Sequence, residues 1–331
     1  MKYRKFGKTD LSVSEIGFGA WGIGGPSMAG EIPIGWGEVD DDKSTAALLK
    51  AYELGVNFFD TADFYGLGHS EELIGRVLGD KKDIIIATKV GHRLAEDNSI
   101  FLDYSKNHIM NACEDSLKRL KRDTIDFYQL HSARMNHLEK GECIEAMELL
   151  KQEGKIRYWG LSLNTFHPEA EAEYLMNHNS ADGFQVVFNI INQIGMKLIK
   201  EAGSAGYGII ARMPLQFGLL TGKFNKDTRF DKNDHRVFRL TPRILSDSLD
   251  ALEDVWPFAE KYNISKTSLS LAFITAHKEV STVIPGIKTA EQAVLNCEPV
   301  SVDLPEEFLE SMHKLYETKM HRLVELMERQ G

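Results

Sequence analysis

Short apolar segments alternate with helix-like segments along almost the whole chain, and this alternation constrains the fold more than any other feature. Segments with apolar residues at helical spacing, such as Lys43–Leu54, Lys106–Leu120 and Leu138–Lys151, separate the apolar runs. Strands that alternate with helices form a parallel sheet, and eight such units predict an α/β protein with a (β/α)8 (TIM) barrel. The eight apolar runs are Ile16–Gly19, Asn57–Asp60, Ile84–Lys89, Thr124–His131, Tyr158–Leu161, Phe184–Phe188, Gly208–Ala211 and Thr282–Ile284.

An open, doubly wound sheet is the alternative fold for this pattern. That fold binds dinucleotides through a G-x-G-x-x-G motif after its first strand. Here the glycines of Gly17–Gly19 and Gly22–Gly25 do not have that spacing. The 331 residues contain no Gly/Ser-rich or Pro-rich linker and no internal repeat, so we expect residues 1–331 to form a single barrel domain.

Four segments lie outside the regular alternation. Residues 2–14 alternate weakly around a turn sequence and predict an N-terminal β-hairpin. Residues 20–42 and 216–246 predict two long loops on the C-terminal face of the barrel, where active sites of this fold lie. Residues 305–329 predict a last amphipathic helix, which leaves the oligomeric state undetermined.

Three positions predict helix boundaries. Asp42 is a candidate N-cap for the first helix, and Ser70 followed by Glu71 suits another helix N-terminus. Gly154 follows the helix that ends near Lys151, as a C-terminal glycine does.

The stretch Asn57–Gly66 begins as an apolar run and ends in a polar loop, so it predicts a buried strand that opens into a site. Asp60 falls where that strand ends, and Tyr65 follows in a glycine-flanked loop. The next two predicted strands end in Lys89 and His131. Because neighbouring parallel strands end at the same rim of a barrel, we expect these four side chains to converge.

Taken singly, each of these residues is an ordinary polar group at a strand end, but together they suit proton donation. A phenol with a pKa of about 10 donates poorly at neutral pH, and an adjacent ammonium group lowers that pKa by stabilising phenolate. We therefore expect Lys89 to lower the pKa of Tyr65, and Asp60 to keep Lys89 charged and oriented. His131 would bind a carbonyl oxygen or tune Tyr65.

Charge and cysteine content restrict the partners. The formal net charge of −10 argues against nucleic acid or an anionic membrane as the main partner. No apolar run approaches the ~18 residues of a membrane helix, and no signal-peptide core follows the basic N-terminus. Cys113, Cys143 and Cys297 are far apart and lack metal-ligand spacing. We expect reduced thiols, no metal site and a cytoplasmic location.

From about residue 3 to residue 300, the sequence resembles the aldo-keto reductase superfamily. The specific signature is the Asp-Thr-Ala-x-x-Tyr-Gly stretch from Asp60 to Gly66, with Ser70-Glu71 after it. The catalytic Asp, Tyr, Lys and His of that family fall on Asp60, Tyr65, Lys89 and His131. The resemblance implies that NAD(P)H delivers hydride to an aldehyde or ketone while Tyr65 protonates the forming alkoxide.

The resemblance also implies where the cofactor binds. Ser162 and Gln185 would hold the carboxamide, and the run 214–223 would close over the pyrophosphate. Lys288 would face a 2′-phosphate, which favours NADP over NAD. The cofactor-binding residues implied in this way are Gly19, Ala20, Trp21, Asp60, Ser162, Gln185, Arg212, Pro214, Leu215, Gly218, Leu220, Lys223, Gly286, Lys288, Gln292 and Asn296.

The loop segment 223–243 is basic although the protein is acidic, with three aspartates among its basic residues. A basic loop over a barrel mouth suits a phosphate-bearing ligand, and an ordinary solvated loop is the alternative. The basic residues are Lys223, Lys226, Arg229, Lys232, Arg236, Arg239 and Arg243.

Two positions depart from the commonest family pattern. The residue after Ser162 is often Asn, but here it is Leu163, with Asn164 one position further. Strand alternation sends positions 163 and 164 in different directions. Arg212 stands where many members have an aromatic residue that stacks on the nicotinamide. A guanidinium can stack too, but its charge would weaken binding of the oxidised cofactor relative to the reduced form.

Trp21, Trp36, Phe64 and His92 are expected to wall the pocket for a small carbonyl or alcohol substrate. A second hypothesis is a nicotinamide-binding regulatory subunit of the potassium-channel β-subunit type, since that class belongs to the same family. No evident extra N-terminal segment precedes the barrel, which favours a free enzyme. A barrel hydrolase or isomerase would need paired acids or metal ligands, and Asp63 is the only acid close to Asp60 in its loop.

Overall fold

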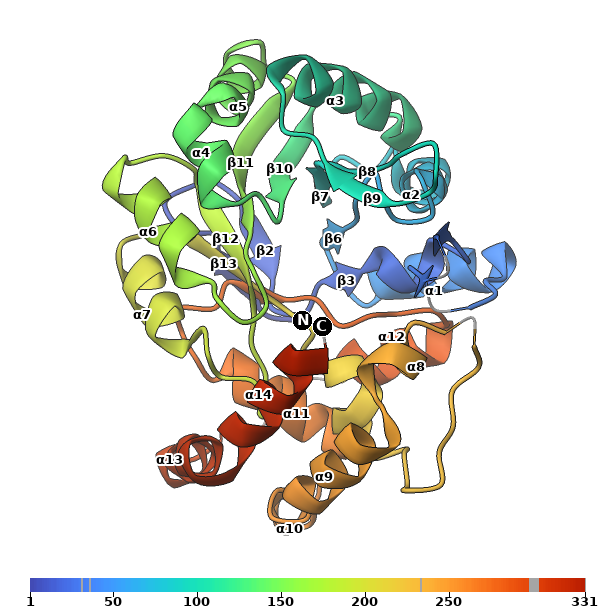
Figure 1. The fold of residues 1–331 in the computed structure, drawn as a ribbon, viewed down its shortest axis with the longest axis vertical. Coiled ribbons are helices and arrows are strands. Elements are labelled where there is room, and N and C mark those ends of the chain that lie inside the picture. Colours follow the sequence, from blue (N-terminus) through green and yellow to red (C-terminus); the bar gives the residue numbers. More distant parts are fainter. Residues whose placement is uncertain (31, 36, 233, 298–303, 331) are drawn as a thin grey trace.

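Eight parallel strands form one curled sheet in the computed structural model, which describes the chain except residues 31, 36, 233, 298–303 and 331 (Figure 1). Parallel bridges from Ile16 to Val283 and from Gly19 to Gly286 join the first strand to the last. The predicted (β/α)8 barrel is therefore confirmed, and every predicted apolar run overlaps a strand. In sheet order the strands are β14 (Thr282–Val283), β13 (Gly208–Arg212), β12 (Gly183–Val187), β11 (Ile156–Ser162), β10 (Ile125–His131), β7 (Ile85–Val90), β6 (Phe58–Asp60) and β3 (Phe18–Gly19).

Helices surround this sheet and bury their apolar faces against its outer side (Figure 1). No helix in the described part of the chain is long and apolar enough to cross a membrane. The helices are α1 (Asp41–Glu53), α2 (His69–Leu78), α3 (Lys106–Leu120), α4 (Met135–Lys140), α5 (Glu142–Gln152), α6 (Glu169–Asn177), α7 (Met196–Ser204), α8 (Arg236–Arg239), α9 (Pro242–Leu252), α10 (Trp256–Lys261), α11 (Lys266–Thr275), α12 (Ala290–Cys297), α13 (Glu306–Leu315) and α14 (His321–Gln330).

The predicted N-terminal hairpin closes the barrel end at which the strands begin. Its strands are β1 (Tyr3–Lys5) and β2 (Ser12–Ser14), and the Phe6 ring that follows β1 is fully buried. A Cβ on Gly208, the first residue of β13, would lie 2.3 Å from a Phe6 ring atom, so only glycine fits there. The hairpin thus plugs the bottom of the barrel, opposite the face where active sites of this fold lie.

Helix boundaries differ from the sequence prediction at one of three positions. Asp40, and not Asp42, caps α1, because the Asp40 carboxylate accepts hydrogen bonds from two backbone amides of the first turn. The helix N-terminus predicted at Ser70 and Glu71 is confirmed, since α2 begins at His69 and both residues lie in its first turn. Gly154 follows α5 in the left-handed conformation, with φ of 72°, as predicted.

Three predicted segments are more divided than expected. Residues 138–151 are not one helix, since Gly141 takes a φ of 78° and separates α4 from α5. The long loops contain short elements, which are η1 (Ala20–Ile23), β4 (Met28–Ala29), β5 (Ile32–Pro33) and η2 (Gln216–Thr221). A π-helical turn, η3 (Tyr316–Met320), divides the last helix into α13 and α14.

The C-terminal helix α14 packs against α8 and α9 beside the open end of the barrel (Figure 1). Its Met327 sulfur accepts a hydrogen bond of 3.3 Å from Gln216 Nε2. Gln216 and Phe217 have positive φ angles of 42° and 57°, which non-glycine residues rarely adopt. Asn189 Nδ2 donates to Gln216 Oε1 at 2.8 Å, so buried contacts hold this strained turn in place.

Candidate active site

The C-terminal ends of the strands open into a cavity of about 720 Å³. Its floor consists of strand ends, and its walls come from the loops that follow them. The hairpin of β8 (His92–Leu94) and β9 (Ile100–Leu102) supplies one wall, and η2 with α8 supplies another. The lining strand ends are Gly19, Asp60, His131, Ser162, Gln185 and Arg212.

The structure brings Asp60, Lys89 and Tyr65 into direct contact. Lys89 Nζ donates to Asp60 Oδ2 at 2.6 Å and to the Tyr65 hydroxyl at 3.2 Å. It also donates to the Thr61 carbonyl at 2.7 Å, and its side chain is fully buried. The three donor positions of the ammonium are therefore all used, and its orientation is fixed.

Two glutamines complete the hydrogen bonds of Asp60. Gln185 Nε2 and Gln129 Nε2 donate to Asp60 Oδ1 at 2.8 Å and 3.1 Å. Sequence reasoning missed Gln129, although it precedes His131 by two positions on β10 and so faces the same side of the strand. A buried carboxylate held by an ammonium and two amides is a rigid acceptor, and it keeps Lys89 in place.

The proton affinities of this pair follow from competing effects. Burial disfavours the Lys89 ammonium, but the charge of Asp60 and the contact with Tyr65 raise the pKa of Lys89 above its usual value. Burial also raises the pKa of Tyr65, and the Lys89 charge opposes that rise only in part. The predicted net decrease for Tyr65 is therefore wrong, although the direction of the Lys89 contribution is right.

His131 lies beside Tyr65, with their ring centroids 5.9 Å apart in an edge-on arrangement. Burial, with the charges of neighbouring groups, lowers the pKa of His131 well below its usual range. The His92 ring lies 4.2 Å from the His131 ring, and burial lowers the pKa of His92 to about 4. Both imidazoles are thus neutral at physiological pH.

Asp63 does not pair with Asp60 in the cavity. It is absent from the cavity lining, and burial, followed by repulsion from Glu71, raises the pKa of Asp63 well above its usual value. Within the described residues, no group of three or more His, Cys, Asp or Glu side chains is arranged to hold a metal. The arrangement therefore offers no carboxylate pair of the kind that a glycosidase-like mechanism uses.

Most of the residues predicted from the resemblance line the cavity. Of the predicted cofactor set, Ala20 and Leu220 do not line it and are buried. Of the predicted substrate walls, Trp21, Phe64 and His92 line the cavity, whereas Trp36 lies outside the described residues. The cofactor-set residues that line it are Gly19, Trp21, Asp60, Ser162, Gln185, Arg212, Pro214, Leu215, Gly218, Lys223, Gly286, Lys288, Gln292 and Asn296.

The basic loop divides into two groups. Lys223, Arg236 and Arg239 line the cavity, and Arg236 forms an ion pair with Asp234. The other four basic residues are exposed and lie outside the cavity lining: Lys226, Arg229, Lys232 and Arg243.

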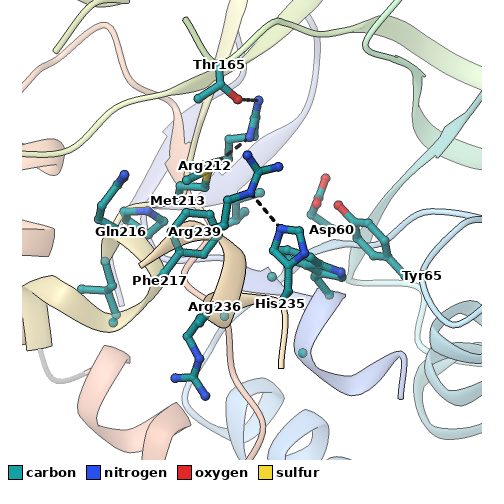
Figure 2. A pocket seen from close by; sticks show the side chains of 18 of the residues that line it. Asp60, Tyr65, Thr165, Arg212, Met213, Gln216, Phe217, His235, Arg236 and Arg239 are labelled. Carbon is teal, nitrogen blue, oxygen red and sulfur yellow. Dashed lines mark hydrogen bonds between the residues drawn. The ribbon is translucent and has the colours of Figure 1, made fainter. Parts of the chain in front are cut away.

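The two departures from the family pattern have clear positions. Asn164 is not part of the cavity lining, because its side chain accepts from the backbone amides of Phe166 and His167. Arg212 lines the cavity, and its Nη2 donates to the Leu163 carbonyl at 3.0 Å and to Thr165 Oγ1 at 3.1 Å (Figure 2). Burial lowers the pKa of Arg212 to about 10, so it stays charged at neutral pH.

Comparison with known proteins agrees with this geometry. The sequence model of the Aldo/keto reductase family matches residues 15–317. The chain is 33% identical over 294 residues to the uncharacterized oxidoreductase YqkF of Bacillus subtilis. The aligned region covers 88% of this chain and 89% of that protein.

Two solved structures are similar over nearly their whole length. They are the glycerol dehydrogenase AKR11B4 from Gluconobacter oxydans (28% identity, TM-score 0.80, 96% of this chain and 95% of that chain) and the holo form of the aldo-keto reductase AKR11C1 from Bacillus halodurans (30% identity, TM-score 0.76, 95% and 96%). These matches define the class, which is an oxidoreductase on a (β/α)8 barrel. The chain belongs to the aldo/keto reductase family, whose members bind nicotinamide cofactors.

Proposed function

We propose that this protein reduces an aldehyde or ketone to an alcohol by hydride transfer from NADPH, with Tyr65 as general acid. The observation that carries the proposal is the position of Lys89 Nζ, 2.6 Å from the Asp60 carboxylate and 3.2 Å from the Tyr65 hydroxyl, at the cavity floor. The Lys89 ammonium lies between the Asp60 carboxylate and the Tyr65 hydroxyl, and Tyr65 lines the cavity as the proton donor.

The residues around the floor fit a nicotinamide cofactor. Ser162 and Gln185 present a hydroxyl and an amide to the cavity, 3.3 Å apart, which match the hydrogen-bonding groups of a carboxamide. Lys223 and Arg236 line the path toward Lys288 and are suited to phosphates. When bound, the cofactor supplies the hydride.

Tyr65 transfers its hydroxyl proton to the carbonyl oxygen of the substrate. Lys89 stabilises the phenolate that remains, because its ammonium contacts the phenol oxygen and lies 4.8 Å from the ring centroid. Asp60 keeps Lys89 protonated. His131 is neutral, so it can donate one hydrogen bond to the carbonyl oxygen without adding a charge.

The preference for NADPH over NADH rests on Lys288. Its side chain lines the cavity, where the charge of Arg236 acts on it unfavourably and that of Asp234 favourably. A dianionic 2′-phosphate would gain from contact with the Lys288 and Arg236 charges, whereas a ribose hydroxyl would not.

The test is a titration of NADPH and NADH into the purified protein, followed by addition of 4-nitrobenzaldehyde. We expect tighter binding of NADPH and aldehyde-dependent loss of its near-ultraviolet absorbance, both measured in wild type and in Tyr65→Phe. Binding without turnover across a panel of carbonyl compounds would favour the regulatory-subunit alternative. Binding of neither nucleotide would contradict the proposal.

A further inference from the structure

Arg239 is a cation of the cavity lining that has no acidic partner among the described residues. It lies on α8, and its Nε donates to His235 Nε2 at 3.0 Å. In the described part of the chain, no carboxylate oxygen lies within 4 Å of Arg239, and neither Nη atom has a hydrogen-bond partner. Arg236, three residues earlier on the same helix, is in contrast paired with Asp234.

Arg239 is partly buried and lies close to another cation. Burial lowers the pKa of Arg239, and the charge of Arg239 acts unfavourably on Arg212. Figure 2 shows Arg239 extending from the loop past His235 toward Arg212. A partly buried guanidinium that has no acidic partner among the described residues is available to an anionic ligand that enters the cavity.

The position of Arg239 connects it to the reacting end of the cavity. Its partner His235 packs edge-on against Trp21, with ring centroids 5.4 Å apart, and Trp21 lies 6.4 Å from the Tyr65 ring. Lys288, which fits the adenosine phosphate, lines the cavity from the segment after β14, whereas Arg239 lies on α8. A substrate whose carbonyl group lies at Tyr65 therefore has room to extend its far end along Trp21 to Arg239.

We propose that the substrate is a carbonyl compound with a carboxylate at its far end, and that Arg239 is the residue that selects for this charge. The proposal rests on the reductase function proposed above. The planar guanidinium presents two Nη groups that bond to none of the described residues, and their spacing matches the two oxygens of a carboxylate. Basic groups concentrated at the mouth of a protein with a net charge of −10 would also attract an anionic substrate.

The experiment compares 4-carboxybenzaldehyde with 4-nitrobenzaldehyde, which are similar in size and both electron-poor, although only the first is charged. With NADPH saturating, the ratio of their kcat/KM values is measured in wild type and in Arg239→Met. We expect the ratio to fall roughly 10- to 100-fold in Arg239→Met, through KM of the carboxylate substrate, as for loss of a hydrogen bond to a charged group. Turnover of 4-nitrobenzaldehyde, which has no carboxylate, should change much less.

Two further variants distinguish a direct contact between Arg239 and the carboxylate from a general effect of the positive charge of the loop. Arg239→Lys keeps the charge and should retain part of the preference for the carboxylate. Arg229→Met removes one charge from the same loop outside the cavity lining, so it should leave the ratio unchanged. An equal fall for both aldehydes would mean that Arg239 has only a structural role, and would overturn the proposal.

A cofactor titration tests whether Arg239 binds a phosphate of the cofactor instead of a substrate carboxylate. If Arg239→Met weakens NADPH binding and leaves the aldehyde ratio unchanged, Arg239 binds a cofactor phosphate, and the proposal is wrong. If wild type turns over neither aldehyde, the reductase function fails on its own. The carboxylate site is then tested by binding of 4-(hydroxymethyl)benzoate against 4-nitrobenzyl alcohol, followed by tryptophan fluorescence. A preference for the benzoate that Arg239→Met abolishes would support the site, and equal binding would overturn it.

Discussion

The charged side chains on the floor of the cavity are paired with opposite charges, whereas two cations on the loop wall are not paired among the described residues. On the floor, Asp60 and Lys89 lie at strand ends, neutralise each other and have full sets of hydrogen bonds. On the wall formed by the loop after β13, Lys223 and Arg239 have no acidic partner within 4 Å among the described residues. Preorganised groups of the first kind suit chemistry, whereas cations of the second kind suit ligand binding.

Strands and loops position their side chains in different ways. A barrel strand fixes the position of its last side chain through ladders on both sides, so the acid site needs no ligand to assemble. A loop side chain can contact different ligands, and its charge is neutralised only when an oppositely charged ligand binds. Changes on the floor should therefore affect turnover and folding, and changes on the wall should affect affinity.

The largest expected effect is that of Tyr65→Phe. Removal of the proton donor should lower kcat/KM for a neutral aldehyde by about 10²- to 10⁴-fold, the usual contribution of general acid catalysis. NADPH binding should persist, because Lys89 and Asp60 keep their ion pair. Stopped-flow turnover and cofactor fluorescence measure the two quantities, and a matching loss of cofactor affinity would contradict the separation of floor and wall.

Asp60→Asn should mainly destabilise the fold. The change leaves the fully buried Lys89 ammonium without a counter-charge, which costs about 3–5 kcal/mol in comparable buried pairs. Urea denaturation measures the free energy of unfolding. The double variant Asp60→Asn/Lys89→Met should be less destabilised than the sum of the two single variants. Strict additivity would show that the two side chains do not act as a pair.

Protonation of His92 should reduce stability in acid. The pKa of His92 in the folded protein is about 4, below its ordinary 6.5, so the unfolded chain takes up this proton first. Its contribution to stability is therefore complete above pH 6.5 and is lost as pH falls toward 4, by up to about 3 kcal/mol. For His92→Gln, the free energy of unfolding should decrease less across this pH range than for wild type. An identical pH dependence in the two proteins would contradict the prediction.

Lys288→Met tests a cation of the cavity lining that follows β14 and not β13. Loss of one charge-assisted contact to a 2′-phosphate should weaken NADPH binding by roughly 10- to 100-fold and leave NADH binding unchanged. Lys226→Met is the matched control, because Lys226 pairs with Asp250 outside the cavity. An equal loss of affinity for NADPH and NADH would show that Lys288 does not distinguish the 2′-phosphate from a ribose hydroxyl.

Arg212→Tyr should give the smallest effect. If the guanidinium lies against the nicotinamide, replacing it with an uncharged ring should strengthen binding of NADP⁺ relative to NADPH by a few-fold, or about 1 kcal/mol. The two dissociation constants are measured by fluorescence in wild type and variant. An unchanged ratio means that the charge of Arg212 does not act on the oxidised ring.

The strand-end side chains were predictable because order and direction of strands determine where they meet. Asp60, Lys89 and His131 came from that argument, and Gln129 was within its reach through the two-residue period of β10. The pKa of Tyr65 was not predictable, since the extent of burial depends on packing that a sequence pattern does not give.

Loop details were less accessible from the sequence. The cap at Asp40 and the break at Gly141 depend on local backbone geometry that several nearby residues could satisfy. The basic loop was visible as a charge pattern, but which of its cations enter the cavity follows from how the 216–246 segment folds. Arg239 thus appeared in the sequence only as one basic residue among seven.

The ring closure between Gly19 and Gly286, together with the contact of Met327 with Gln216, bears on how the protein is made. A ribosome must release nearly the whole chain before the first strand finds its last neighbour. Until then, β3 and β13 are open sheet edges, and the apolar side chains behind them are exposed to other nascent chains. We therefore expect translation arrest before residue 286 to yield aggregation-prone or chaperone-bound fragments, with cofactor binding appearing only late in synthesis.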